Sequence, residues 1–165
     1  MSKEYLLPYQ HEQLLKEMEK LSRGVRSIMQ EHGTAAENGD ETDNAEMDCA
    51  ERKFRVLNAR LESLRSLLHS SEVFPWNRVA THKVGLGCSV RVKDADKELE
   101  FRVNVVGPVL VDMDRDEVSY AAPMGNALLD HVPGETVTYK VGERVFRYAI
   151  INISRYDPTT YVSEG

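Results

Sequence analysis

The chain has 165 residues, of which 41% are hydrophobic and 29% charged, and its net charge is −6 at pH 7. This length suits one or two small domains, and the negative balance excludes binding to nucleic acid or anionic membranes through overall charge alone. No secretory signal or long uncharged apolar run is present, so we expect a soluble cytoplasmic protein whose two cysteines, Cys49 and Cys88, are reduced thiols.

Two segments of the N-terminal half carry apolar residues at the 3.5-residue spacing of coiled coils. They span residues 9–35 and 44–70. When the chain is folded back at residue 41, these positions pair as Leu14 with Leu68, Met18 with Leu64, Leu21 with Leu61, Val25 with Leu57, and Ile28 with Phe54. The pattern predicts an antiparallel two-helix coiled coil, a rod about 40 Å long with residues 38–43 at its tip.

Charges are separated along this predicted rod. Between Ser27 and Glu51 there is no Lys or Arg, while acidic residues are frequent: Glu31, Glu37, Asp40, Glu41, Asp43, Glu46, Asp48 and Glu51. Basic residues follow on both helices, and we call them the basic collar: Arg23, Arg26, Arg52, Lys53 and Arg55. We therefore expect an acidic tip with the basic collar about 15–20 Å behind it.

The acidic residues of the tip have structural as well as functional interpretations. Asp43 followed by Glu46 fits a helix capping box, and Asp40 and Glu41 after Gly39 suit a solvated turn. The functional alternatives are a Mg²⁺ site that shares a substrate phosphate, a protein-docking tip, and acid–base catalysis, which needs a pocket. A rod that presents carboxylates makes most sense if it enters another protein's active site, where they help hold a second metal and orient a water.

The C-terminal half changes to a two-residue period, which is typical of strands. After a break at Pro75, two hairpins are predicted, at residues 89–105 and 137–153, with one short helix at 124–129 between them. An acidic run, Asp112, Asp114, Asp116 and Glu117, is interpreted as a solvated loop. The predicted fold class is α+β: a coiled-coil domain at residues 1–76 and a small antiparallel sheet domain at 77–165.

Two segments carry a resemblance to a known family. The tip reads Gly39-Asp40-Glu41-Thr42-Asp43-Asn44-Ala45-Glu46-Met47, and residues 122–129 read Ala122-Pro123-Met124-Gly125-Asn126-Ala127-Leu128-Leu129. In this order, and joined to a mirrored coiled coil, they resemble the Gre family of bacterial transcript-cleavage factors. That family's segments read approximately Gly-Asp-Leu-(Ser/Lys)-Glu-Asn-Ala-Glu-Tyr and Ser-Pro-Leu-Gly-x-Ala-Leu-Leu. The residues Asn44-Ala45-Glu46 lean toward the GreA branch over GreB.

The resemblance implies an FKBP-like C-terminal domain that docks on RNA polymerase through Pro123, Met124 and Gly125. The coiled coil would enter the polymerase secondary channel and place Asp40 and Asp43 as catalytic acids on a Mg²⁺ shared with the polymerase site. The basic collar would contact RNA phosphates or the channel wall. The polymerase would then cut the 3′ end of backtracked nascent RNA, so the chain, expected to be a monomer, would not be an enzyme on its own.

This sequence also departs from the family pattern. Asp43 is one methylene shorter than the family Glu, so it reaches about 1.5 Å less far, and a misplacement of that order can cost about 10²-fold in a positioned reaction. Met47 replaces a family aromatic residue. A Gre-fold paralogue that docks in the channel and inhibits or modulates transcription without cleavage is therefore the alternative. A coiled-coil adaptor and a prolyl isomerase are weaker options.

Overall fold

The structure of the chain, a computed structural model, describes residues 3–37 and 44–163. Its compact units are a helical unit, Glu12–Ser70, and a sheet unit, which joins Met1–His11 to Ser71–Gly165. A helical pair followed by a curled sheet with a short helix confirms the predicted fold class. The sheet unit takes in the N-terminal segment because the short strands β1 (Glu4–Leu6) and β2 (Ser71–Val73) pair in parallel.

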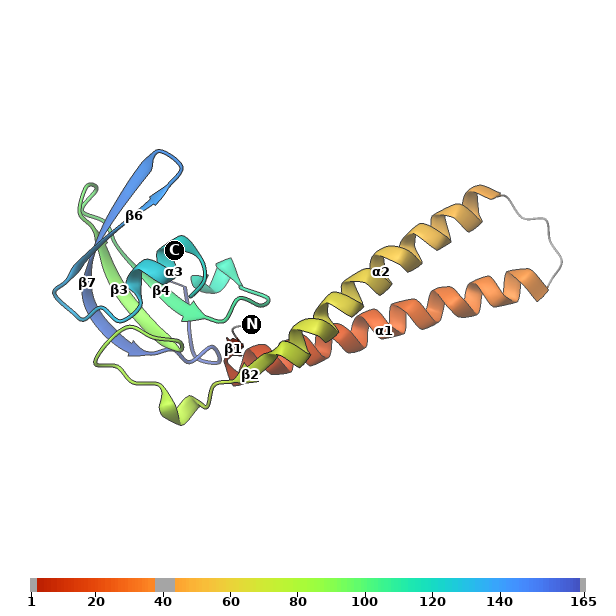
Figure 1. The fold of residues 1–165 in the computed structure, drawn as a ribbon, viewed down its shortest axis with the longest axis horizontal. Coiled ribbons are helices and arrows are strands. Elements are labelled where there is room, and N and C mark those ends of the chain that lie inside the picture. The colour runs from red at the N-terminus through yellow and green to blue at the C-terminus, as the bar shows by residue number, and fades with distance from the viewer. Residues whose placement is uncertain (1–2, 38–43, 164–165) are drawn as a thin grey trace. The chain divides into compact units, whose positions relative to one another are not determined.

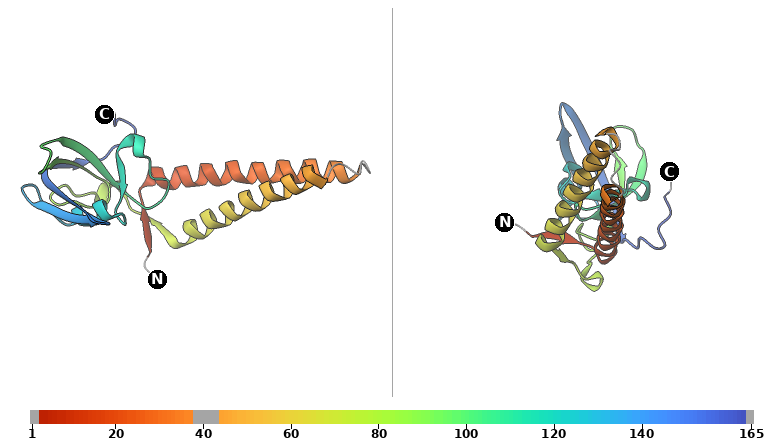
Figure 2. Two further views of the ribbon diagram at one scale, coloured as in Figure 1. Left: turned by 90° about the horizontal axis from the view of Figure 1, so that it is seen from above. Right: turned by 90° about the vertical axis from the view of Figure 1, so that its right-hand side faces the viewer.

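The helical unit consists of two long antiparallel helices, α1 (Pro8–Glu37) and α2 (Asn44–Ser70) (Figure 1 and Figure 2). Their bounds match the two predicted segments to within two residues. Leu21 and Leu61, which the sequence pairs across the coil, are 9% and 4% exposed. A Cβ added to Gly24 would lie 3.3 Å from Leu57 Cδ1, so this glycine lets the helices approach closely. That approach offsets the helix propensity, about 1 kcal/mol, that glycine loses to alanine.

The sheet unit is built on five strands in the order β5-β4-β3-β7-β6. Their bounds are β3 (Cys88–Asp94), β4 (Glu100–Val106), β5 (Glu117–Ser119), β6 (Thr136–Val141) and β7 (Arg144–Arg155). The hairpins β3–β4 and β6–β7 pair antiparallel, as the two-residue period predicts. The three-residue β5 pairs parallel to β4, which makes the sheet mixed. The helix α3 (Pro123–Leu128) lies on one face, where Leu128 joins a core that includes Val90, Val105 and Ile150 (Figure 1).

Gln10 fixes the start of α1 within the sheet unit. Pro8 occupies the first helical position, where a missing N–H costs nothing. Gln10 lies two residues further along, and its Oε1 accepts the backbone N–H of Leu7 at 3.1 Å, which satisfies a donor at the helix N-terminus. Its amide also exchanges two hydrogen bonds with the backbone of Gly107, at 2.8 and 2.9 Å. Because Gln10 is 1% exposed, these bonds have no competing water.

The acidic run shows that one part of the loop interpretation is wrong. Glu117, expected in a solvated loop, is 6% exposed at the start of β5. Its carboxylate accepts hydrogen bonds from the hydroxyls of Tyr9 and Tyr156, the latter at 2.7 Å, and from the backbone N–H of Asp112 at 2.9 Å. A carboxylate can be buried when hydrogen bonds replace its water. Tyr9 and Tyr156 lie far from Glu117 in sequence, so no local pattern indicated its burial.

The two tyrosines predict how stability depends on alkaline pH. Burial, followed by the hydrogen bond to the Glu117 carboxylate and its negative charge, raises the pKa of both Tyr9 and Tyr156 above the usual value near 10. Unfolded tyrosines lose their protons first as pH rises, so the contribution of these two tyrosines to stability should be constant below about pH 10 and fall above it. Each tyrosine contributes a slope of up to about 1.4 kcal/mol per pH unit.

Urea unfolding from about pH 8 to about pH 11 measures this loss. The variant Tyr156→Phe should be less stable at neutral pH, but its stability should fall less steeply with alkaline pH. Equal slopes for the wild type and the variant would contradict the assignment.

Candidate functional site

The predicted catalytic residues fall between the two long helices. The helix α1 ends at Glu37 and α2 begins at Asn44. Asp40 and Asp43, together with the proposed cap at Asp43, lie outside the described residues. The described residues that flank them in sequence are the charged side chains at the start of α2 and the basic collar.

The flanking charges on α2 are open to solvent. Glu46, Asp48 and Glu51 are exposed near the start of the helix, and the basic residues Arg52 and Lys53 follow them, also exposed. Because the acids come first and the cations second along one helix, the predicted charge separation is present along α2. Each of these side chains can reach an external ligand without any rearrangement of the core.

The rest of the basic collar is also exposed, and two of its members contact neighbouring groups of their own helices. Arg55 lies 3.6 Å from Glu51, in a pair whose side chains are 73% and 55% exposed. Such a surface pair contributes less than about 1 kcal/mol, so an anion can displace it. On α1, Arg23 and Arg26 are exposed, and Arg26 Nε donates to the carbonyl of Ser22 at 3.4 Å. The basic collar is thus a set of solvent-facing cations on both helices.

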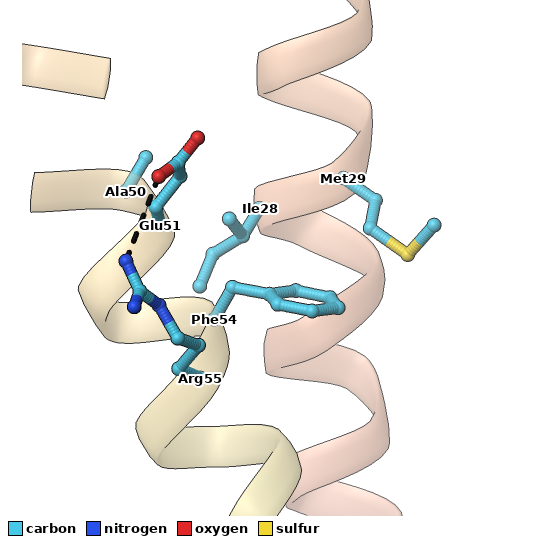
Figure 3. Close-up of a pocket in the computed structure, with 6 residues that line it drawn as sticks. All are labelled: Ile28, Met29, Ala50, Glu51, Phe54 and Arg55. Atoms are coloured by element: carbon cyan, nitrogen blue, oxygen red, sulfur yellow. Dashed lines mark ion pairs between the residues drawn. The ribbon is translucent and has the colours of Figure 1, made fainter. Parts of the chain in front are cut away.

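An apolar hollow lies beside the Glu51–Arg55 pair. It has a volume of about 380 Å³. Figure 3 shows Phe54 of α2 reaching across α1, with Ile28 between the two helices and Met29 on the outer side. The sequence interpretation placed Phe54 in the coil core, whereas here it is half-buried and lines a surface hollow. An apolar surface next to exposed cations suits a ligand that is both apolar and anionic.

The predicted docking segment is the short helix α3. Pro123 is exposed at its N-terminus, while Met124 is half-buried and packs on the sheet core. Gly125 is buried, and a Cβ at this position would lie 2.0 Å from the carbonyl oxygen of Ser119. Pro123 therefore offers contact surface, whereas Gly125 allows α3 to lie directly against the backbone at the end of β5.

This close approach predicts that Gly125→Ala destabilises the sheet unit by about 2–3 kcal/mol, because the obstacle is backbone and cannot rotate away. Gly85→Ala is the matched control, since no atom lies within 4 Å of its added Cβ. Urea unfolding followed by the fluorescence of Trp76 measures the difference. Equal midpoints for the two variants would contradict the packing role of Gly125.

Sequence reasoning missed a second hollow in the sheet unit, with a volume of about 420 Å³. Its lining includes Tyr5, Phe74, Arg78, Tyr120 and Leu129. The Tyr120 hydroxyl donates to Glu4 at 3.0 Å and accepts from the backbone N–H of Tyr5 at 3.0 Å. Its walls come from the N-terminal segment, the β2 region and the residues around α3, so only the folded chain brings them together.

Neither a metal site nor a membrane-spanning helix is found among the described residues. Within residues 3–37 and 44–163, no group of three or more His, Cys, Asp or Glu side chains is arranged to hold a metal. None of the described helices is long and apolar enough to cross a membrane. Cys49 and Cys88 are both unpaired thiols, exposed and buried respectively.

Comparisons with known proteins cover nearly the whole chain. A family model described as "Transcription elongation factor, GreA/GreB, C-term" matches residues 79–155, and one described as "Transcription elongation factor, N-terminal" matches residues 4–73. Transcription elongation factor GreA of Thermodesulfovibrio yellowstonii is 33% identical over 150 residues, which are 90% of this chain and 95% of that protein. GreA of Nitratiruptor sp. is 27% identical over 151 residues, 92% of this chain and 93% of that protein.

Among solved structures, GreA factor homolog 1 (Gfh1) of Thermus thermophilus is similar, with 22% identity and a TM-score of 0.45. The similarity covers 93% of this chain and 99% of that one. A GreA/GreB factor from Nitrosomonas europaea has 19% identity and a TM-score of 0.40, over 93% of this chain and 99% of that one.

Proposed function

The chain belongs to the GreA/GreB family of transcription elongation factors, and on this premise we propose that it rescues arrested transcription by stimulating cleavage of backtracked RNA. The tip of the helical hairpin enters the secondary channel of RNA polymerase, and the polymerase cuts the nascent RNA near its 3′ end. The chain acts as a monomer in the cytoplasm and is not an enzyme by itself, because the polymerase supplies the reaction centre.

The observation that carries this proposal is where the acidic segment lies in the chain. In sequence, Asp40 and Asp43 belong to the segment that connects α1 to α2, two antiparallel helices of a family member. The 30 residues of α1 correspond to about 45 Å of helix, enough to carry a tip deep into a channel. The exposed acids Glu46 and Asp48 continue the negative charge onto α2.

The donor set of the tip fits Mg²⁺, because carboxylate oxygens are its preferred protein ligands and one or two of them suffice when substrate phosphates complete the shell. Mg²⁺ held by the polymerase supplies activation of water for phosphodiester hydrolysis. Asp40 and Asp43 bind at that centre and orient the attacking water. They are catalytic residues of a site that exists only when the tip is inserted.

The remaining predicted residues position the tip. Arg52 and Lys53 contact RNA phosphates or the channel wall, where their charge offsets repulsion between the acidic tip and RNA. Pro123 and Met124 contact the polymerase from α3, and Gly125 allows α3 to take its place. Docking through the sheet unit and insertion through the helical unit are then separable functions.

The test uses stalled, backtracked elongation complexes that carry RNA labelled at its 3′ end. Adding the full chain with Mg²⁺ should release short 3′ fragments and restore elongation. Polymerase binding without fragment release would contradict the proposal and favour the channel-docking inhibitor.

A further inference from the structure

The sheet presents basic side chains on the face opposite α3. Residues alternate between faces along each strand, so Val90 and Val92 of β3 join the core with α3 while Arg91 and Lys93 point the other way. We call this second side the outer face. Four strands place cations on it: Arg91, Lys93, Arg102, Lys140 and Arg147. Across the described part of these strands, Glu100 is the acid that shares the outer face.

Strand register arranges these cations as a diagonal, which we call the basic stripe. Arg102 of β4 is paired with Arg91 of β3, and Lys93 follows two residues along. Lys93 pairs with Ala149 of β7, two residues from Arg147. Arg147 pairs with Thr138 of β6, and Lys140 lies two residues beyond. With about 6.7 Å per two residues and about 4.8 Å between strands, the basic stripe extends for about 25 Å.

The charges of the basic stripe are only partly neutralised within the fold. Arg91 lies 3.5 Å from Glu100, and Arg102 donates to the hydroxyls of Ser89 and Ser154. For Lys93, Lys140 and Arg147, no acidic partner lies within 4 Å among the described residues. Arg91 and Arg102 directly opposite each other are destabilising, since like charges repel across a strand pair. The fold therefore retains a charge cluster that an anionic ligand would stabilise.

We propose that the basic stripe binds the phosphodiester backbone of a nucleic acid strand. A length of about 25 Å spans several phosphates at about 3.4 Å of rise per phosphate. The exposed hydroxyl of Thr138 lies among the cations and can donate to phosphate oxygens as well.

The outer face favours backbone contact over base reading or protein docking. The aromatic rings of these strands, Phe101, Tyr139, Phe146 and Tyr148, pack on the core side, so none of them is available to stack a base. A protein partner would need an apolar centre. The outer face offers only the separated side chains Val145 and Ile151. Binding is thus expected to be electrostatic and independent of sequence, and it does not depend on the cleavage proposed above.

The experiment measures fluorescence anisotropy of a labelled oligouridylate, and in a second arm a labelled DNA duplex, with the full chain over a range of salt concentrations. Replacing three cations together (Lys93→Gln, Lys140→Gln and Arg147→Gln) should weaken binding at least about tenfold at low salt. It should also reduce the slope of log affinity against log salt by about 2. Comparing the two arms shows whether the basic stripe prefers single-stranded RNA or double-stranded DNA.

Matched variants make the result specific. Replacing Lys3, Lys83 and Lys97 with Gln removes the same charge from exposed positions of the sheet unit, and binding should change less than about twofold. Equal losses in the two triple variants, or no binding by the wild type, would overturn the proposal. Loss only when Arg52 and Lys53 are replaced would overturn it and leave the cleavage proposal standing. Unchanged nucleic acid binding with lost polymerase binding would reassign the stripe to a protein partner.

A single charge reversal, Arg147→Glu, provides a second variant that keeps the other cations. Arg147 is exposed, so the fold should be unaffected. Its binding should fall more than that of Arg147→Gln, because repulsion is added to the lost attraction. Indistinguishable affinities for these two variants would also overturn the proposal.

Discussion

Asp40→Asn and Asp43→Asn are each expected to lower the rate of fragment release from backtracked complexes by about 10²-fold or more, while polymerase binding changes little. Asparagine keeps the size of the side chain but loses the charge that a second metal requires. A residue that acts only in the transition state lowers the rate without weakening binding. Single-turnover cleavage at saturating factor separates the two effects.

Two further variants sharpen this prediction. Asp48→Asn removes an exposed acid from α2 behind the tip, and its rate should stay within about threefold of the wild type. Asp43→Glu restores the reach of the family residue, and the rate should rise because about 1.5 Å of misplacement is removed. Full cleavage by both Asn variants would contradict the assignment of Asp40 and Asp43 as catalytic residues. An equal loss of rate for Asp40→Asn and Asp48→Asn would mean that only the total negative charge of this region matters.

The helical unit and the hairpins could be predicted because their signals are local and periodic. Leu21 and Leu61 fall on two 3.5-residue stripes, and both are buried where the stripes meet. In β3, Val90 and Val92 alternate with polar residues, and both are 0% exposed. Each of these elements is long enough for the period to repeat, so the pattern is distinguishable from chance.

Elements without a repeat could not be predicted. The strand β5 has three residues and pairs parallel with β4 through backbone groups alone, which leaves no period to detect. Gln10 is polar and 1% exposed, because its partners Gly107 and Val109 come from a distant loop. A polar side chain is expected to be exposed unless its hydrogen-bond partners inside the fold are known, and the sequence does not show those partners.

Some residues of the candidate sites could likewise be found from the sequence, and others could not. The tip acids were visible because they are close in sequence, and the basic collar because the coiled-coil register places its two parts at a similar height on the rod. The basic stripe was not, since Arg102 and Lys140 meet on one surface only through the register of four strands. The net charge of −6 even argues against such a surface, because a sum over the chain says nothing about where charges gather.

Replacing Glu117 with Leu is expected to lower the free energy of unfolding by at least about 3 kcal/mol. Leucine fills a similar volume but accepts no hydrogen bond, so the hydroxyls of Tyr9 and Tyr156 and the N–H of Asp112 all lose their acceptor. Each buried donor left without a partner costs about 1–3 kcal/mol. Glu117→Gln keeps one acceptor oxygen and should cost less than half as much.

Urea unfolding of the full chain measures these differences, and a double-mutant cycle identifies their source. Adding Tyr156→Phe to Glu117→Leu removes a donor that has already lost its acceptor, so the combined cost should be smaller than the sum by about 1 kcal/mol or more. Additive costs would mean that the Tyr156 hydroxyl does not depend on Glu117. Since Tyr9 lies in the first turn of α1 and Glu117 begins β5, the same bonds hold the start of the long helix to the sheet unit. Loss of Glu117 should therefore raise amide exchange at His11, whose N–H donates to the carbonyl of Leu7 at 3.1 Å, before the rest of the sheet unit, as expected when a local anchor fails first.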